Sequence, residues 1–275
     1  MAYLVGIDEA GYGPNLGPLL ISASVWQLDE RTHRRDGGVE LADVDLYARL
    51  APAVTAHAAE AKADPEGRLA LADSKALYQP SRGLAELERG VLACLAQFTD
   101  EPMTWRAVWQ HFAPGADRQW GTLPWYAGYD PTIPVAAEVL DVAGAGALLG
   151  DAMAAAGVRL LRLRSRPVFP RWFNELVNDC GTKAAALSEL SVGLVAELLR
   201  ELPPGDVHVT CDKHGGRSRY AGLLQHEFPD ARLAIRHERR DESAYRLALD
   251  TRTVDVRFCV GGERYLPAAV ASMVS

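Results

Sequence analysis

Hydrophobic residues recur along the chain at two spacings, that of a β-strand and that of an α-helix. Short apolar runs bounded by turn residues, and one segment in which arginines alternate with apolar side chains, predict strands over residues 3–7, 19–25, 158–168, 207–211 and 233–237. Apolar positions at helical spacing predict helices over residues 46–63, 84–98, 135–156, 173–202, 220–226 and 265–274. A further pair of strands, 245–249 and 254–260, flanks a turn at Asp250-Thr251-Arg252. This order of strands and helices predicts an α/β fold with a mixed sheet flanked by helices.

Two adjacent acids stand where the first strand ends. Asp8 and Glu9 precede a connection that contains three glycines and two prolines before the second strand begins. Such a connection lets the backbone come close to a bulky molecule. A strand that carries carboxylates at its end suits a hard divalent cation such as Mg²⁺. The alternative is a solvated turn, in which Asp-Glu is an ordinary pair.

A second acid follows a later strand. Asp212 comes directly after the strand at 207–211, about two hundred positions beyond Asp8. The crossover helix predicted over 173–202 can make the two strands neighbours, so that Asp8, Glu9 and Asp212 share one site. Carboxylates without histidine or cysteine ligands suit a pair of Mg²⁺ or Mn²⁺ ions about 4 Å apart on a phosphodiester.

Composition is that of a globular protein. The 275 residues are 48% hydrophobic and 24% charged, which allows one α/β domain with a large insertion or about two domains. We find no run of about 18 apolar residues and no targeting segment, and we therefore expect a cytoplasmic protein with no membrane partner. The four cysteines are far apart and form no CxxC pair, which fits a reducing compartment and argues against zinc.

The net charge of −7 is unusual for a protein that binds nucleic acid, but basic residues gather in two segments. The first contains Arg159, Arg162, Arg164, Arg166 and Arg171, and the second contains Arg236, His237, Arg239 and Arg240. Each segment is either a phosphate-binding patch or a solvated face of a strand or loop.

Aromatic residues crowd one irregular stretch, residues 99–130. Its members are Trp105, Trp109, Trp120, Trp125 and Tyr126. Aromatic rings beside arginines can stack on unpaired bases, but this density favours a local hydrophobic cluster.

The motif around the first acids resembles a known family. Gly6-Ile7-Asp8-Glu9-Ala10-Gly11, followed by Gly13-Pro14 and Gly17-Pro18, resembles the signature of ribonuclease HII, the type 2 ribonuclease H. Later landmarks occur in the same order and comprise Asp73-Ser74-Lys75, Asn174 with its helix, the strand ending in Asp212, and the alanine-rich, serine-containing helix at 266–272. The resemblance covers only part of the chain, and its first motif is the specific one.

The resemblance implies a single ribonuclease H-like domain, residues 1–275, with an insertion at about 99–157. It also implies a metal-dependent endonuclease that cleaves the RNA strand of RNA/DNA hybrids by two-metal phosphodiester hydrolysis. Asp8, Glu9 and Asp212 would be catalytic metal ligands for Mg²⁺ or Mn²⁺. Glu263 is favoured as the fourth ligand over Asp241, because the helix at 265–274 follows Glu263 directly. Asp241 is then explained as a surface ion pair with its neighbouring arginines.

The resemblance further implies a set of residues that contact the substrate. The sequence departs from the family pattern at two places that bear on substrate binding. The expected contacts are Gly11, Tyr12, Gly13, Ser74, Lys75 and Asn174. Tyr12 stands where the family has an arginine or lysine, between the two glycines that help to read the ribose 2′-hydroxyl, and this departure puts strict ribonucleotide selection in doubt. The basic carboxyl-terminal helices of the family are also missing, which favours either a truncated sequence or a rebuilt substrate-binding surface.

Two other classes of function stay open. An actin or sugar-kinase type of phosphotransferase also begins with a strand, an acid, a turn and a strand, and it needs a second phosphate loop. Asp212-Lys213-His214-Gly215-Gly216 is a weak version of that loop. A non-catalytic relative that binds hybrids is the other alternative, and the oligomeric state is not predicted.

Overall fold

A seven-stranded mixed sheet runs through the molecule. The computed structural model describes residues 1–275 except 11–16, 30–39, 65–66, 79, 82 and 100–102. The strands in spatial order are β7 (Val158–Val168), β2 (Leu19–Leu28), β1 (Ala2–Ala10), β8 (Asp206–Asp212), β11 (Arg252–Cys259), β10 (Glu242–Leu249) and β9 (Arg232–Glu238). The α/β prediction with a mixed sheet is confirmed.

Strand β1 lies inside the sheet between β2 and β8, and its first six residues are buried on both faces. It pairs antiparallel with β2 and parallel with β8, and β8 pairs parallel with β11. Ile7 lies opposite Cys211 at the last β1–β8 pair. The carboxyl ends of these parallel strands therefore meet at one edge of the sheet, where Asp8 and Asp212 follow that pair.

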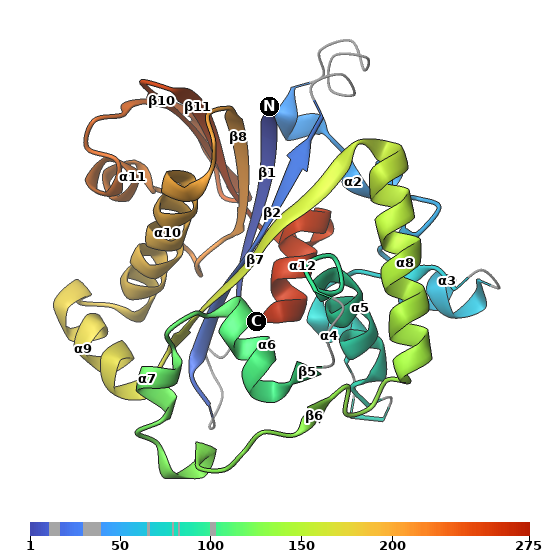
Figure 1. The fold of residues 1–275 in the computed structure, drawn as a ribbon. Helices are drawn as coiled ribbons and strands as arrows, with labels where there is room; N and C mark the ends of the chain where they lie inside the picture. Colours follow the sequence, from blue (N-terminus) through green and yellow to red (C-terminus); the bar gives the residue numbers. More distant parts are fainter. Residues whose placement is uncertain (11–16, 30–39, 65–66, 79, 82, 100–102) are drawn as a thin grey trace.

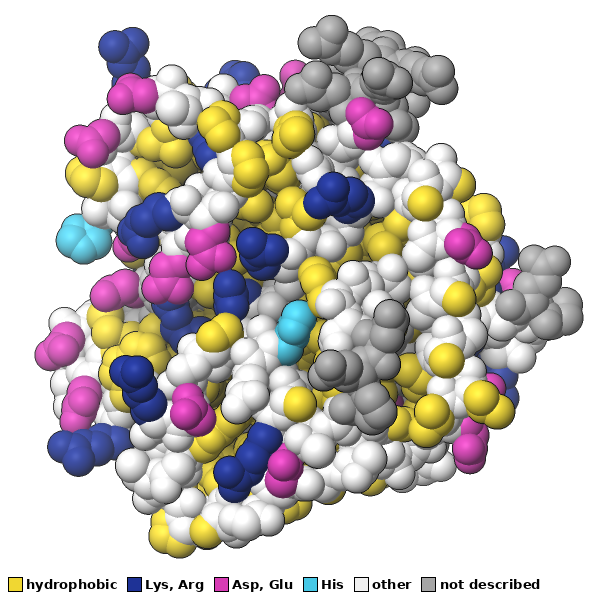
Figure 2. All heavy atoms as spheres, in the orientation of Figure 1, with side chains coloured by type: hydrophobic (Ala, Val, Ile, Leu, Met, Phe, Trp, Pro, Cys, Tyr) yellow, Lys and Arg dark blue, Asp and Glu magenta, His cyan; other side chains and the backbone are white. Residues whose placement is uncertain are grey.

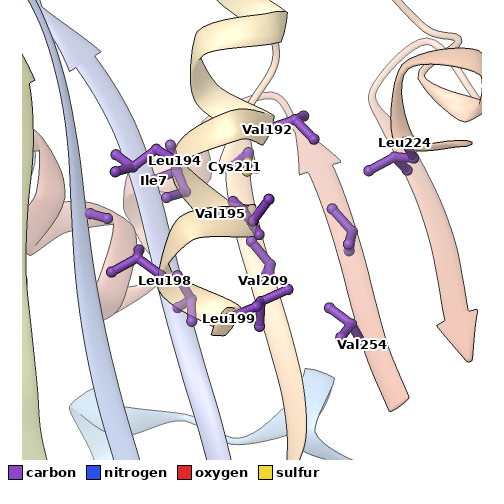
Figure 3. Close-up of a cluster of buried hydrophobic side chains, with 14 of the residues drawn as sticks. Ile7, Val192, Leu194, Val195, Leu198, Leu199, Val209, Cys211, Leu224 and Val254 are labelled. Carbon is purple, nitrogen blue, oxygen red and sulfur yellow. The ribbon is translucent and has the colours of Figure 1, made fainter. Parts of the chain in front are cut away.

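Helices cover both faces of the sheet (Figure 1). On one face, alternate residues of β1 and β8 pack against α10 (Lys183–Glu201) and α11 (Ala221–Glu227). Figure 3 shows leucine and valine side chains of α10 meeting Ile7, Val209 and Cys211 on the strands. On the other face lie α12 (Leu266–Val274), α5 (Ala85–Leu95) and α8 (Val139–Ala156). Strand alternation of side chains thus produces two apolar layers.

Helix α12 lies directly on β1 and β2. A Cβ atom at Gly6 would overlap the main chain of Pro267 and Ala268, so only glycine permits this approach. The Ser24 hydroxyl donates to the Pro267 carbonyl at 2.6 Å. The position of α12 relative to the end of β1 is consequently set by main-chain contact.

The single helix expected over residues 46–63 is wrong. The chain forms α2 (Leu46–Arg49), β3 (Val54–Thr55) and α3 (Ala58–Ala63), and β3 pairs with β4 (Leu69–Ala70). Pro52 lies between α2 and β3. Proline has no amide hydrogen and disfavours helical geometry in the residue before it, so it interrupts the alanine-rich helical pattern.

The helix expected over 173–202 is two helices, α9 (Pro170–Cys180) and α10. Gly181, with φ of 78°, ends α9 in the left-handed conformation. The Thr182 side chain then accepts a hydrogen bond from the Ala185 amide at 3.1 Å and caps α10. The apolar period continues across both helices, which is why the sequence pattern did not reveal the break.

The aromatic stretch forms a local cluster, as predicted. Its elements are β5 (Met103–Thr104), α6 (Trp105–Phe112), α7 (Asp117–Trp120), η2 (Pro124–Tyr126) and β6 (Thr132–Ile133). Trp105 packs against Trp109, Trp120 and Tyr126, whereas Trp125 is 67% exposed and lies outside the cluster. Most of these rings are therefore occupied in packing.

Helix α8 is mostly apolar, with Asp141 and Asp151 as its charged residues. By length and composition alone it could cross a membrane, with a mean hydropathy of 1.5 and 22% of its residues buried. Gly146 and Gly150 approach Ala96 and Gln97 closely, and Gln97 donates to the Gly146 carbonyl at 2.9 Å. The helix is thus packed onto α5 as part of the fold.

Candidate active site

Asp8 lies half-buried near the end of β1, on the α12 side of the sheet. Burial raises the pKa of its carboxyl to about 6, and a hydrogen bond from Ser272 opposes this rise. The negative charges of Asp212 and Glu263 also contribute to this raised pKa. The Asp8 carboxyl therefore shares its surroundings with two acids that are distant in sequence.

Glu9 is subject to the same charges. Burial raises its pKa to about 8, followed in importance by the charges of Asp8 and Asp212. Lys75 lowers this pKa, and Glu263 raises it. The four acids predicted as catalytic, together with Lys75, thus act on one another at the carboxyl edge of the sheet.

A tight turn brings Glu263 to Asp212. Glu263 belongs to η3 (Gly262–Arg264), which follows β11. The Gly262 amide donates to Asp212 Oδ1 at 3.1 Å, and a Cβ at Gly262 would stand 3.1 Å from the Asp212 amide nitrogen. Glycine at 262 therefore allows the turn to rest on the end of β8.

Ser272 links the carboxylates to a distant loop. Asp73 accepts a hydrogen bond from the Lys75 amide at 3.1 Å and caps the short helix α4 (Ser74–Leu77). The Ser272 hydroxyl donates to Asp73 at 3.4 Å and lies 3.3 Å from the Ser74 hydroxyl. The same hydroxyl can give its single proton to Asp8 instead of Asp73, so α12 holds the Asp-Ser-Lys loop beside the acids.

Ser272 was not among the predicted site residues. Its helix was expected only through the resemblance to a serine-containing helix after the fourth acid. Nothing in the local pattern distinguishes Ser272 from a core position of α12, because its role depends on Asp8 and on Asp73, which are remote in sequence.

The structure does not place the other predicted substrate-contact residues beside the four acids. Gly11, Tyr12 and Gly13 lie outside the described residues. Asn174 is exposed on α9, and its side chain makes no hydrogen bond to a site carboxylate within the part of the chain that the structure describes. Its proposed substrate contact stays a prediction.

Asp241 differs from Glu263 in its electrostatic neighbours. It lies in the turn between β9 and β10 and acts on Lys213, whereas Glu263 acts on Asp8 and Glu9. Among the described side chains, Asp241 forms no ion pair within 4.0 Å with either adjacent arginine. The preference for Glu263 over Asp241 therefore has an electrostatic reason, but the expected ion pair of Asp241 is absent.

The donor chemistry of this edge fits a divalent cation. Asp8, Glu9, Asp212 and Glu263 supply carboxylate oxygens, which Mg²⁺ and Mn²⁺ prefer, and their mutual repulsion is what a cation would relieve. As the described side chains are placed, no three histidine, cysteine, aspartate or glutamate groups are close enough to hold an ion. All four side chains are half-buried and must rotate to enclose a cation.

Comparison with known proteins does not assign this chain to a family. No protein-family model matches the sequence, and no curated protein matches it.

Proposed function

We propose that this protein is a divalent-metal-dependent endonuclease that cleaves the RNA strand of RNA/DNA hybrids. The observation that carries the proposal is the convergence of Asp8, Glu9, Asp212 and Glu263, from three separate strand ends, into one charged site. The mixed sheet, with β1 between β2 and β8 and helices on both faces, is compatible with a ribonuclease H-like fold. The resemblance of the first motif to ribonuclease HII points to the same class.

The chain's own groups suit phosphodiester hydrolysis. Asp8, Glu9, Asp212 and Glu263 would hold the metal ions, which supply activation of water and stabilisation of developing charge when bound. The charge of Lys75 lowers the pKa of Glu9, and its ammonium would contact a substrate phosphate beside the acids. Ser272 orients Asp8 and keeps the Lys75 loop in place.

The proposed reaction is hydrolysis with inversion at phosphorus. A water molecule gives up a proton to solvent as its oxygen forms a bond to the phosphorus, the bond between phosphorus and O3′ breaks, and O3′ takes up a proton from solvent. The products are a 3′-hydroxyl and a 5′-phosphate, as the resemblance implies. No co-reactant other than water is required.

The direct test is cleavage of a labelled RNA/DNA hybrid with Mg²⁺ or Mn²⁺. We expect wild-type protein to cut the RNA strand, and Asp8→Asn to lose about 100-fold or more of the activity because one ligand carboxylate is removed. Asp151→Asn, on the exposed side of α8, removes the same charge away from the site and serves as the control. Equal cleavage by wild type and Asp8→Asn would contradict the proposal.

We also infer a cytoplasmic location for this activity. All four cysteines are free thiols, and Cys94, Cys211 and Cys259 are buried. Unpaired cysteines are usual in a reducing compartment, which supports the inference.

A further inference from the structure

The two basic segments of the sequence have different surroundings in the structure. On β7, Arg166 pairs with Glu197 of α10 at 2.6 Å, and Arg164 pairs with Glu201 at 3.2 Å. Figure 2 shows basic and acidic side chains intermixed over α10 and β7. Most positive charges of this first segment are thus neutralised within the fold. Their ion pairs attach strand β7 to helix α10.

The second segment has unneutralised arginines. Arg239 and Arg240 lie in the turn between β9 and β10, and both are exposed. Within the described part of the chain, neither guanidinium has an acidic partner within 4.0 Å, whereas the neighbouring His237 pairs with Glu242 at 2.9 Å. Two free positive charges therefore stand together on a protein whose net charge is −7.

Strand directions bring this turn to the edge that carries the carboxylates. Strand β9 is antiparallel to β10, β10 is antiparallel to β11, and β11 is parallel to β8. Glu242 lies opposite Cys259, which lies opposite Asp212. The start of β10 is therefore two strand spacings, about 10 Å, from the Asp212 backbone. Arg239 and Arg240 precede it immediately.

A buried lysine ties the turn to the end of β8. Lys213 follows Asp212 and is only 8% exposed. Its ammonium donates to the Arg239 carbonyl at 2.7 Å and to the Ser243 hydroxyl at 3.3 Å, and its amide donates to the Cys259 carbonyl at 3.2 Å. Burying an ammonium is costly, so these bonds are needed to hold it, and they fix the turn relative to Asp212.

We propose that Arg239 and Arg240 form a phosphate-binding rim that grips the nucleic-acid backbone beside the carboxylates. The proposal rests on the proposed function, because it names the surface by which the same substrate is held. Guanidinium groups bind phosphate oxygens through paired, charge-assisted hydrogen bonds. Lys213 keeps the rim at a constant distance from Asp212, so that a phosphate gripped at the rim places a neighbouring one at the acids.

The test is binding of a fluorescein-labelled RNA/DNA hybrid to the full chain, followed by anisotropy at several salt concentrations in EDTA. We expect Arg239→Gln/Arg240→Gln to bind about tenfold more weakly at 0.1 M salt. The slope of log affinity against log salt should become shallower by about 2, because each arginine that is removed leaves one phosphate without its cation. Arg239→Lys/Arg240→Lys should restore most of the slope, because the slope depends on charge.

Arg159→Gln/Arg232→Gln is the matched control. Both arginines are exposed, and they stand near the starts of β7 and β9, at the opposite edge of the same sheet. The control removes the same net charge and should bind nearly as wild type. Equal weakening in the control and the rim variant would overturn the rim, as would wild-type binding by the rim variant.

Failure of the rim is distinguishable from failure of the proposed function. Hybrid cleavage by wild type with unchanged binding by the rim variant would refute only the rim. The predicted loss of binding, in a protein that never cleaves hybrid with Mg²⁺ or Mn²⁺, would support the rim and refute the nuclease. Absence of hybrid binding by wild type, even at low salt, would refute both.

Discussion

Gly6 is the residue on which the packing of α12 depends. Its neighbours on β1 are large apolar side chains, yet any Cβ here would overlap the Pro267 main chain. Because α12 carries Ser272, the space at Gly6 also determines how closely Ser272 approaches Asp8. A residue with no functional group therefore helps to position the site.

We expect Gly6→Ala to lower the free energy of unfolding by about 1–3 kcal/mol or more, because α12 must move away from β1. Gly144→Ala is the control, since a Cβ at this exposed position of α8 meets nothing within 4 Å. That substitution should raise stability by about 0.5–1 kcal/mol through helix propensity. Urea unfolding of both variants measures the difference, and equal effects would contradict the packing argument.

Glu9 experiences repulsion that a cation should relieve. Burial and the neighbouring acids raise its pKa to about 8, so at pH 9 most of the protein carries this charge at a cost in stability. In metal-free buffer at pH 9, Glu9→Gln should raise the melting temperature by about 2–6 °C. Added Mg²⁺ should stabilise wild type more than Glu9→Gln. A larger Mg²⁺ shift in the variant would show that Glu9 is not a ligand.

At the scale of elements, strand β7 is attached to α10 by arginines. The side chain of Arg166 is 18% exposed; it pairs with Glu197 and also donates to the Leu190 carbonyl at 3.0 Å. Arg171 of α9 pairs with Glu175 but is 93% exposed. Exposed ion pairs contribute little to stability, whereas breaking a partly buried one leaves polar groups unsatisfied.

Arg166→Met should consequently cost about 1–3 kcal/mol of unfolding free energy, and Arg171→Met should stay within about 0.5 kcal/mol of wild type. Denaturant titrations of the two variants provide the measurement. A cost for Arg171→Met that matches that of Arg166→Met would show that β7 is not held to α10 by these contacts.

At the scale of the whole molecule, the stability of the fold depends on pH through buried histidine. His208 of β8 is 6% exposed, and neither ring nitrogen has a hydrogen-bond partner among the described residues. Burial, together with the charge of Arg257, lowers its pKa to about 4, and the charge of Asp255 opposes this change. The unfolded chain therefore binds a proton at higher pH than the folded protein does.

The stability contributed by neutral His208 is fully present above about pH 6.5 and is lost as the pH falls toward 4, by about 2–3 kcal/mol in total. Asp8 and Glu9 have raised pKa values, so their contribution to stability increases as the pH falls, opposite to that of His208. The pH dependence of the unfolding free energy is therefore compared between each histidine variant and wild type. His208→Phe should flatten the loss between pH 6.5 and 4.5, with the exposed His57→Phe as a control of equal histidine count. Identical pH profiles of His208→Phe and wild type would contradict the assignment.

Local structure was predictable where a single period ran between clear turn residues. The strands at 158–168 and 207–211, the hairpin at 245–260 and the helix at 265–274 correspond to β7, β8, β10 with β11, and α12. The helices at 46–63 and 173–202 were predicted wrongly as continuous, because one residue in each, Pro52 or Gly181, outweighs a long apolar pattern.

The sequence by itself determined the elements and the acids at their ends, since side-chain period and turn chemistry are local properties. Only the tertiary structure decided which ends meet, because strand order and direction depend on pairing between distant segments. The same holds for the two arginine segments, which look alike in sequence. Glu197 and Glu201 pair with Arg162, Arg164 and Arg166 of the first segment, and no described acid lies within 4.0 Å of Arg239 and Arg240 in the second. Charge acts through space, so its consequences follow the fold.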